Sequence, residues 1–286
     1  MRVGFLCLGV MGFPMAGHLA AAGHEVAVYN RTASRREEWL ARNPGRALAT
    51  PAEAVTGADC VLACTGNDDD LRAITLGPDG AFAAMSRDSV FVDHTTASAK
   101  LARELAAHAS EQGFAYLDAP VSGGQAGAEN AALTVMLGGE QSDYERIVPL
   151  LDCYARKHLL LGPVGSGQLT KMVNQICIAG LLQALSEALH FAGRSGLDVA
   201  RVVDVISQGA AQSWQMDNRA STMLEGRYDF GFAVDWMRKD LAIALEEAAR
   251  CGADLTITAL VDQLYAQIQA RGDGRLDTSS LLTLLE

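Results

Sequence analysis

The stretch VGFLCLGVMGFPMA, residues 3–16, decides the fold of this 286-residue chain. An apolar run predicts a strand at Val3–Leu8, and it passes through a glycine turn into a predicted helix at Phe13–Ala22, which Gly23 ends. A strand that runs directly into a helix in this way is typical of an α/β protein, in which helices cover both faces of a mostly parallel sheet.

The same alternation continues through the first half of the chain. Strands are predicted at 25–29, 60–64, 90–93, 115–119, 133–137 and 157–161, and helices at 34–42, 51–56 and 99–112. Beyond Gly165 only helices are predicted, beginning with one of nearly 27 residues at 168–194 and followed by helices near 198–208, 214–224, 232–251, 254–270 and 277–285. We therefore predict an α/β domain with a doubly wound, Rossmann-type sheet at 1–163 and an all-α domain at 164–286, joined by a long helix within 164–194.

Composition narrows the class of partner. The formal net charge of −11 argues against a nucleic acid or an anionic membrane surface. No uninterrupted apolar run reaches 18 residues, so we expect no membrane span, and six cysteines without a C-x-x-C pair fit reduced thiols in a cytoplasmic protein. The six histidines show no metal-ligand spacing, so no metal site is expected.

The glycine turn after the first strand predicts a dinucleotide site. Gly9, Val10, Met11 and Gly12 stand where G-x-G-x-x-G places the pyrophosphate, with Gly9 allowing close approach and Gly12 allowing the helix to pack on the strand. Cys7 occupies the position of the first glycine of the pattern, which is a departure. On these residues alone, a plain turn without a ligand stays open.

The tip of the second predicted strand indicates which dinucleotide is bound. It carries Asn30, Arg31 and Thr32 and lacks the acid that usually holds the ribose of NAD. An arginine there suits a ribose 2′-phosphate, so NADP is favoured over NAD, which stays possible. Further cofactor contacts are predicted at the ends of the next two strands, from the segment 65–67 (Thr65, Gly66 and Asn67) and from Thr96.

Several segments resemble the β-hydroxyacid dehydrogenase family, which includes 3-hydroxyisobutyrate dehydrogenase, tartronate semialdehyde reductase and glyoxylate/succinic semialdehyde reductases. They are residues 4–16, the run DAPVSGGQAGAEN at 118–130, GSGQ at 165–168 with the residues after it, and KDL at 239–241. The resemblance covers nearly the whole chain and implies a nicotinamide-dependent oxidoreductase working as a homodimer or homotetramer. It also implies that Lys239 lies near the nicotinamide. Ala131, where the family usually has glycine, is a second departure.

Two groups of residues are predicted to handle the substrate. Ser122, Gly123 and Gly124 can turn backbone N–H groups and a hydroxyl toward a carboxylate. Lys171, with Asn174 and Gln175 three and four residues further on, forms a polar stripe on an otherwise apolar helix.

Lysine suits this reaction because its ammonium can give a proton to a carbonyl oxygen, and the neutral amine can take one from a hydroxyl. We expect Lys171 to be the general acid/base, helped by Asn174, Gln175 and Ser122. The predicted reaction interconverts a small carboxylate-bearing β-hydroxy acid and its semialdehyde or keto acid.

Two other functions stay open. An imine reductase shares the fold but typically has another residue at the lysine position, so Lys171 counts against it. A dinucleotide-binding interaction protein without catalysis should lack this lysine or carry an added module, and this chain keeps Lys171 and has no appended basic region.

Overall fold

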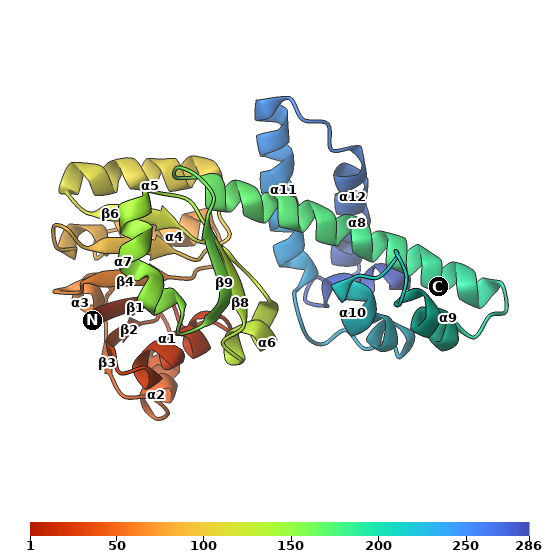
Figure 1. Cartoon of the computed structure of the whole chain (residues 1–286), viewed down its shortest axis with the longest axis horizontal. Helices are drawn as coiled ribbons and strands as arrows, with labels where there is room; N and C mark the ends of the chain where they lie inside the picture. Colours follow the sequence, from red (N-terminus) through yellow and green to blue (C-terminus); the bar gives the residue numbers. More distant parts are fainter. Residues whose placement is uncertain (286) are drawn as a thin grey trace. The chain divides into compact units, whose positions relative to one another are not determined.

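The computed structural model describes residues 1–285, and its chain divides into two compact units (Figure 1). Unit 1 is Met1–Lys171, and unit 2 begins at Met172. The division falls inside the long helix α8 (Ser166–Arg194).

Unit 1 contains a parallel sheet in the order β3-β2-β1-β4-β5-β6. Its strands are β1 (Arg2–Leu6), β2 (Glu25–Tyr29), β3 (Arg46–Leu48), β4 (Cys60–Ala63), β5 (Val90–Asp93) and β6 (Ala115–Asp118). A smaller sheet pairs β7 (Val121–Ser122) antiparallel to β8 (Leu133–Leu137), and β8 parallel to β9 (Ala155–Leu160). From β1 the chain adds β2 and β3 on one side, and it then returns to add β4, β5 and β6 on the other side. This reversal between β1 and β4 makes the sheet doubly wound and confirms the predicted fold class.

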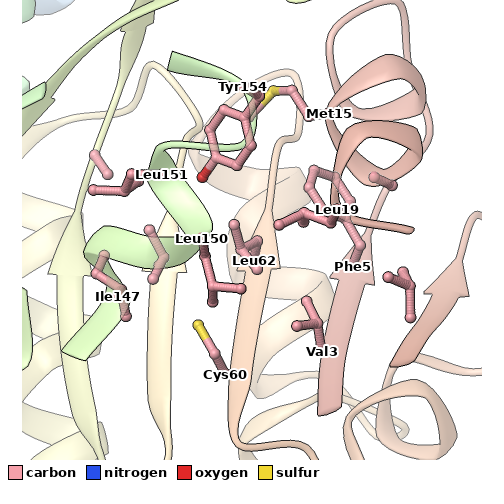
Figure 2. Close-up of a cluster of buried hydrophobic side chains, with 14 of the residues drawn as sticks. Val3, Phe5, Met15, Leu19, Cys60, Leu62, Ile147, Leu150, Leu151 and Tyr154 are labelled. Atoms are coloured by element: carbon pink, nitrogen blue, oxygen red, sulfur yellow. The ribbon is translucent and has the colours of Figure 1, made fainter. Parts of the chain in front are cut away.

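Helices cover both faces of the larger sheet. The helices of unit 1 are α1 (Gly12–Ala21), α2 (Ala33–Leu40), α3 (Pro51–Val55), α4 (Asp68–Leu76), α5 (Ala99–Gln112), α6 (Gly124–Glu129) and α7 (Gln141–Leu151), with a 3₁₀ turn at Phe82–Ala84. Of these, α6 packs against α1 and β8. Side chains alternate between the faces, so that Phe5 enters one buried cluster and Leu6 the other. Figure 2 shows the first cluster, where Leu62 lies among side chains of β1, α1 and α7.

Unit 2 is helical over its described residues. After α8 come α9 (Val199–Ile206), α10 (Trp214–Leu224), α11 (Val234–Cys251), α12 (Thr256–Ala270) and a 3₁₀ segment at Thr278–Leu284. By length and composition alone α8 could cross a membrane. Its Ala179 and Leu182 nevertheless pack into a buried cluster with side chains of α11 and α12.

The predicted elements and the observed ones differ in a few places. The 277–285 segment was expected to be an ordinary helix and forms the tighter 3₁₀ turn. The short strands β3 and β7, the helices α4, α6 and α7 and the 3₁₀ turn at Phe82–Ala84 were not predicted. The helix α7 was missed because Pro149 lies inside it, and proline is unfavourable in a helix interior. The helix α4 was missed because its first turn consists of three consecutive aspartates, a run that is also common in loops, although acids are favourable at a helix N-terminus.

Candidate active site

The loop between β1 and α1 has the geometry that a pyrophosphate needs. A Cβ on Gly12 would lie 2.1 Å from the carbonyl oxygen of Cys7, so only glycine allows α1 to start this close to the strand. A Cβ on Gly9 would meet nothing within 4 Å, so space lies open above the loop. The N-terminus of α1 has no side-chain cap and no acid in its first turn. Its backbone N–H groups therefore fit an anionic ligand.

Cys7 adopts the left-handed backbone conformation, with φ 75°, that the usual glycine would take without strain. Its N–H donates to the carbonyl oxygen of Tyr29 at 2.8 Å, which links the loop to the end of β2. Burial raises the pKa of the Cys7 thiol to about 12. The departure noted in the sequence is thus a strained residue whose thiol stays protonated at neutral pH.

The residues at the tip of β2 differ in how they are used. Asn30 holds the loop, because its Oδ1 accepts from the N–H of Leu8 at 2.9 Å and its Nδ2 donates to the carbonyl of Thr32 at 3.3 Å. The side chain of Arg31 is 88% exposed, with one guanidinium nitrogen 3.8 Å from an oxygen of Asp70. Of these residues, Arg31 has the side chain best able to reach a ligand.

Two further arginines shape this tip and were not predicted from the sequence. Arg35 donates from Nε to the carbonyl of Leu8 at 2.9 Å, and its guanidinium lies 4.2 Å from the ring centre of Phe13. Arg36 donates to the carbonyl of Asn30 at 2.5 Å. Both arginines brace the loops from α2, a role that sequence spacing does not reveal.

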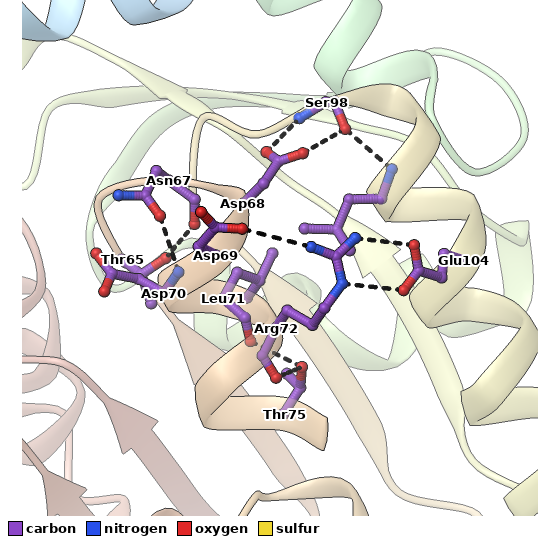
Figure 3. A network of polar contacts seen from close by, with 11 residues as sticks. Thr65, Asn67, Asp68, Asp69, Asp70, Leu71, Arg72, Thr75, Ser98 and Glu104 are labelled. Atoms are coloured by element: carbon purple, nitrogen blue, oxygen red, sulfur yellow. Dashed lines mark hydrogen bonds and ion pairs between the residues drawn. The ribbon is translucent and has the colours of Figure 1, made fainter. Parts of the chain in front are cut away.

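The loops after β4 and β5 are bonded to each other. The N–H of Thr65 donates to Oγ1 of Thr95 at 2.9 Å, and the two hydroxyls lie 3.1 Å apart. In Figure 3 the carboxylate of Asp68 accepts from both the N–H and the hydroxyl of Ser98, while Asn67 caps α4 through the N–H of Asp70. The segment 65–67 and the loop that carries Thr96 therefore meet at the edge of the sheet where β4 and β5 end.

Buried polar groups lie directly beneath this edge. His94 donates from Nδ1 to the carbonyl of Ala119 at 2.6 Å, so its Nε2 accepts from the hydroxyl of Tyr154 at 2.9 Å. Burial lowers the pKa of His94 to about 4, so the ring is neutral at physiological pH. Burial raises the pKa of Asp93 to about 7, although its carboxylate accepts from Thr95 and Tyr116. In residues 1–285 no cluster of potential ligands could hold a metal ion.

The predicted carboxylate-binding turn follows β6. Ser122 ends the short strand β7, and Gly123 and Gly124 have φ of 129° and 60°, which only glycine adopts readily. A Cβ on Gly124 would meet nothing within 4 Å. The turn therefore uses the backbone freedom of both glycines, and the space beside Gly124 is open.

Lys171 is a buried lysine on α8, with 7% of its surface exposed. One turn earlier, Gln168 donates to the carbonyl of Thr95 at 2.7 Å. This bond brings the first turns of α8 to the same sheet edge as the cofactor loops. Within unit 1, Lys171 thus lies one helical turn beyond a residue that is bonded to the loop after β5.

The remaining predicted residues belong to unit 2. Asn174 donates to Oε1 of Gln175 at 2.8 Å, and Gln175 donates to Oδ2 of Asp240 at 2.6 Å. Nζ of Lys239 lies 3.1 Å from the other oxygen of Asp240 and 5.8 Å from the ring centre of Trp236. These contacts join Asn174, Gln175 and Lys239 through Asp240, a buried carboxylate that the sequence reasoning missed. The only signal available was its place between Lys239 and Leu241 in the KDL motif.

The sheet, its glycine turn and the uncapped helix that follows define a protein that binds a nicotinamide dinucleotide. Comparisons support this class. Residues 2–162 match the family model described as the NAD binding domain of 6-phosphogluconate dehydrogenase. Residues 165–285 match a second family model, described as "NAD-binding of NADP-dependent 3-hydroxyisobutyrate dehydrogenase". The chain belongs to the 3-hydroxyisobutyrate dehydrogenase family of NAD(P)-dependent oxidoreductases, which confirms the resemblance seen in the sequence.

Similar proteins span the full length of this chain. An uncharacterized oxidoreductase of Shewanella frigidimarina is 58% identical over 285 residues, covering 100% of this chain and 98% of the relative. The 2-hydroxy-3-oxopropionate reductase of Escherichia coli is 32% identical, covering 100% and 97%. The structure of Mycobacterium tuberculosis 3-hydroxyisobutyrate dehydrogenase with L-serine superimposes with a TM-score of 0.91 at 30% identity, covering 100% of both chains.

Cys7→Gly is expected to keep the fold and to keep or tighten cofactor affinity. A left-handed backbone conformation costs a residue other than glycine about 1–2 kcal/mol, and glycine would remove this strain. Glycine also gives the unfolded chain more conformational freedom, which lowers stability by about 0.5–1 kcal/mol. The net gain in unfolding free energy should therefore lie between zero and about 1.5 kcal/mol. Thermal unfolding and quenching of protein fluorescence by NADPH would measure the two effects.

Ala131→Gly is the matched control, because Ala131 also has a positive φ, of 51°, but lies between α6 and β8 and outside the predicted cofactor loops. It should raise stability similarly and leave NADPH affinity unchanged. A Cys7→Gly protein that binds NADPH more than threefold more weakly would show that the thiol contributes to the site.

Proposed function

We propose that this protein is an NADP(H)-preferring reductase and dehydrogenase that interconverts a small β-hydroxy acid and its semialdehyde or keto acid. The observation that carries the proposal is Lys171, a buried lysine one turn from the bond between Gln168 and the Thr95 loop. A buried amine close to the dinucleotide edge suits proton transfer to or from a substrate oxygen.

Each residue then has a defined task. A bound nicotinamide supplies or accepts the hydride. Lys171 gives its proton to the carbonyl oxygen in reduction and recovers it from the hydroxyl in oxidation, while Asn174 and Gln175, further along the same helix, hold the substrate oxygen and the amine in line. Ser122 and the N–H groups of the 123–124 turn bind the substrate carboxylate.

The substrate can be identified by a spectrophotometric screen at 340 nm. In the reduction direction the panel consists of 2-hydroxy-3-oxopropionate, glyoxylate, succinic semialdehyde and methylmalonate semialdehyde. In the oxidation direction L-serine and 3-hydroxyisobutyrate are the substrates to be tested. A cyclic imine added to the panel tests the alternative chemistry of an imine reductase. Turnover of the imine without turnover of any aldehyde acid would contradict the proposal.

The preference for NADP(H) rests on the exposed guanidinium of Arg31 at a strand tip without an acid. Arg31→Ala should shift the ratio of kcat/KM for NADPH over NADH toward NADH by at least about tenfold, equivalent to about 1.4 kcal/mol. Arg46→Ala is the control, since this exposed arginine starts the neighbouring strand β3 and lies with Arg2 and Glu25 near the amino ends of the strands, away from the tip of β2. NADH as the better cofactor of the wild type, with a ratio that Arg31→Ala does not move, would contradict the assignment.

Lys171→Ala should lower kcat by about 10²–10⁴-fold, the range typical of general acid–base catalysis. The dissociation constant for NADPH should change little, because the predicted phosphate contacts lie on other loops. Lys171→Arg should not restore kcat, since a guanidinium does not release its proton near neutral pH.

Lys157→Ala provides the control for this experiment, as Lys157 is exposed on β9. A Lys171→Ala protein with near-normal kcat would move the acid–base role elsewhere, and Lys239 is the next candidate. A Lys171→Ala protein that fails to fold would favour a structural role for the polar stripe of α8.

We further propose a homodimer or homotetramer working in the cytoplasm. Support comes from a stripe of exposed apolar side chains on the unit 2 part of α8, which includes Val173, Leu181 and Phe191, exposed by 61%, 43% and 70%. A second copy of the chain would cover this stripe. Light scattering after size-exclusion chromatography should give a mass of two or four chains, and Phe191→Asp should lower it; a monomeric wild type would contradict the proposal.

A further inference from the structure

The beginning of α8 is attached to the large sheet by one buried carboxylate. Asp118, at the end of β6, accepts from the N–H of Gly165 at 2.7 Å with Oδ1 and from the N–H of Gln168 at 2.8 Å with Oδ2. Asp118 has no exposed surface. A single side chain thus satisfies two of the backbone donors that the start of a helix leaves open, and its negative charge faces the positive end of the helix.

A second buried side chain makes a complementary pair of bonds. Gln168 donates from Nε2 to the carbonyl of Thr95 at 2.7 Å, and its Oε1 accepts from the N–H of Ala97 at 3.1 Å. Gln168 also has no exposed surface. Its side chain therefore ties α8 to the loop after β5, while its own backbone is tied to β6 through Asp118.

Close packing removes the remaining freedom of this helix start. A Cβ on Gly167 would lie 2.5 Å from the carbonyl oxygen of Met136 and 2.6 Å from that of Asp118. A Cβ on Gly138 would lie 2.5 Å from Oδ1 of Asp118. The first turn of α8 is therefore held directly against the backbone of β6 and β8, with no space in which to slide.

The ionised form of Asp118 is the form that suits these bonds. Burial raises its pKa to about 6, and the N–H groups of Gly165 and Gln168 oppose that rise. At neutral pH the group is therefore mostly a carboxylate that accepts at both oxygens. An asparagine of the same size would place an NH₂ group against one of the two N–H donors.

We infer that Asp118 and Gln168 are positioning residues for proton transfer, which fix the place and rotation of the α8 turn that carries Lys171. Lys171 follows Gln168 by three residues, so any shift of the helix start moves the ammonium by a similar distance. This inference rests on the proposed role of Lys171. Neither Asp118 nor Gln168 is expected to touch substrate or cofactor.

The test is a double-mutant cycle on the purified full-length protein. The assay uses NADPH and the aldehyde acid of the panel that the wild type reduces fastest. Asp118→Asn should lower kcat by about 10–100-fold while KM for the aldehyde acid and the dissociation constant for NADPH change less than threefold. In the Lys171→Ala background the same substitution should lower kcat by less than threefold further, because a residue that acts through Lys171 has nothing left to position.

Tyr116→Phe is the matched control. It removes a buried hydrogen bond of 3.0 Å to Asp93 from the same strand, β6, without touching α8. It should lower the melting temperature yet keep kcat within threefold of the wild type. The control separates the loss of a buried bond in general from the loss of the Asp118 bonds in particular.

The outcomes separate this inference from the proposed function. Near-normal kcat of Lys171→Ala overturns the proposed role of the lysine. Two outcomes overturn the positioning role alone, provided that Lys171→Ala strongly lowers kcat. In the first, Asp118→Asn keeps kcat within threefold of the wild type, as Tyr116→Phe does. In the second, the losses of kcat caused by Asp118→Asn and Lys171→Ala multiply in the double mutant. If Asp118→Asn does not fold, Gln168→Glu decides in the same cycle, because its second oxygen would face the Thr95 carbonyl and repel it.

Discussion

The parallel register of β1, β4, β5 and β6 is the constraint on which the candidate site depends. Register pairs such as Leu6 with Ala63 and Asp93 with Asp118 bring the ends of successive strands to one edge, although these residues are far apart in sequence. Each crossover helix returns the chain to the other end of the sheet, so every loop that follows a strand is delivered to the same place. The glycine turn, the tip of β2 and the Thr65 and Thr95 loops share one edge for this reason. The start of α8, which follows a strand of the smaller sheet, joins them through its bonds to Asp118 and to the carbonyl of Thr95.

Much of this arrangement could be predicted, because the signals were local. Hydrophobic periodicity located β2, β5, α5 and α10 to the residue, and the glycine pattern identified the first loop. The positions at which Cys7 and Ala131 replace expected glycines both have positive φ, as the pattern implied. Contacts between distant segments could not be foreseen in the same way. Neither the bracing by Arg35 and Arg36 nor the burial of Asp118 and Asp240 leaves a periodic signal, since each depends on where another segment of the chain arrives.

The polar groups buried at the sheet edge show how such a site is kept stable. Asp93, His94 and Asp118 are removed from water, and each has hydrogen-bond partners within unit 1. For His94 the arrangement favours a neutral ring, whereas for Asp118 the backbone amides favour the anion. Burial would penalise these groups heavily if they lacked partners, and here their directional bonds fix the loops more tightly than apolar packing would.

The continuity of α8 has a consequence for how this chain can change. An α-helix turns by about 100° for each residue, so one residue inserted or deleted between Gln168 and Lys171 would rotate the lysine away from the anchored helix start. The same change between Lys171 and Asn174 would rotate the lysine out of phase with Asn174 and Gln175. Substitutions at exposed positions of the same helix leave the angular relation between Lys171, Asn174 and Gln175 unchanged. Related chains should therefore tolerate changes of residue along α8 far better than changes of its length, and a gap in this short interval would mark a protein whose chemistry has diverged.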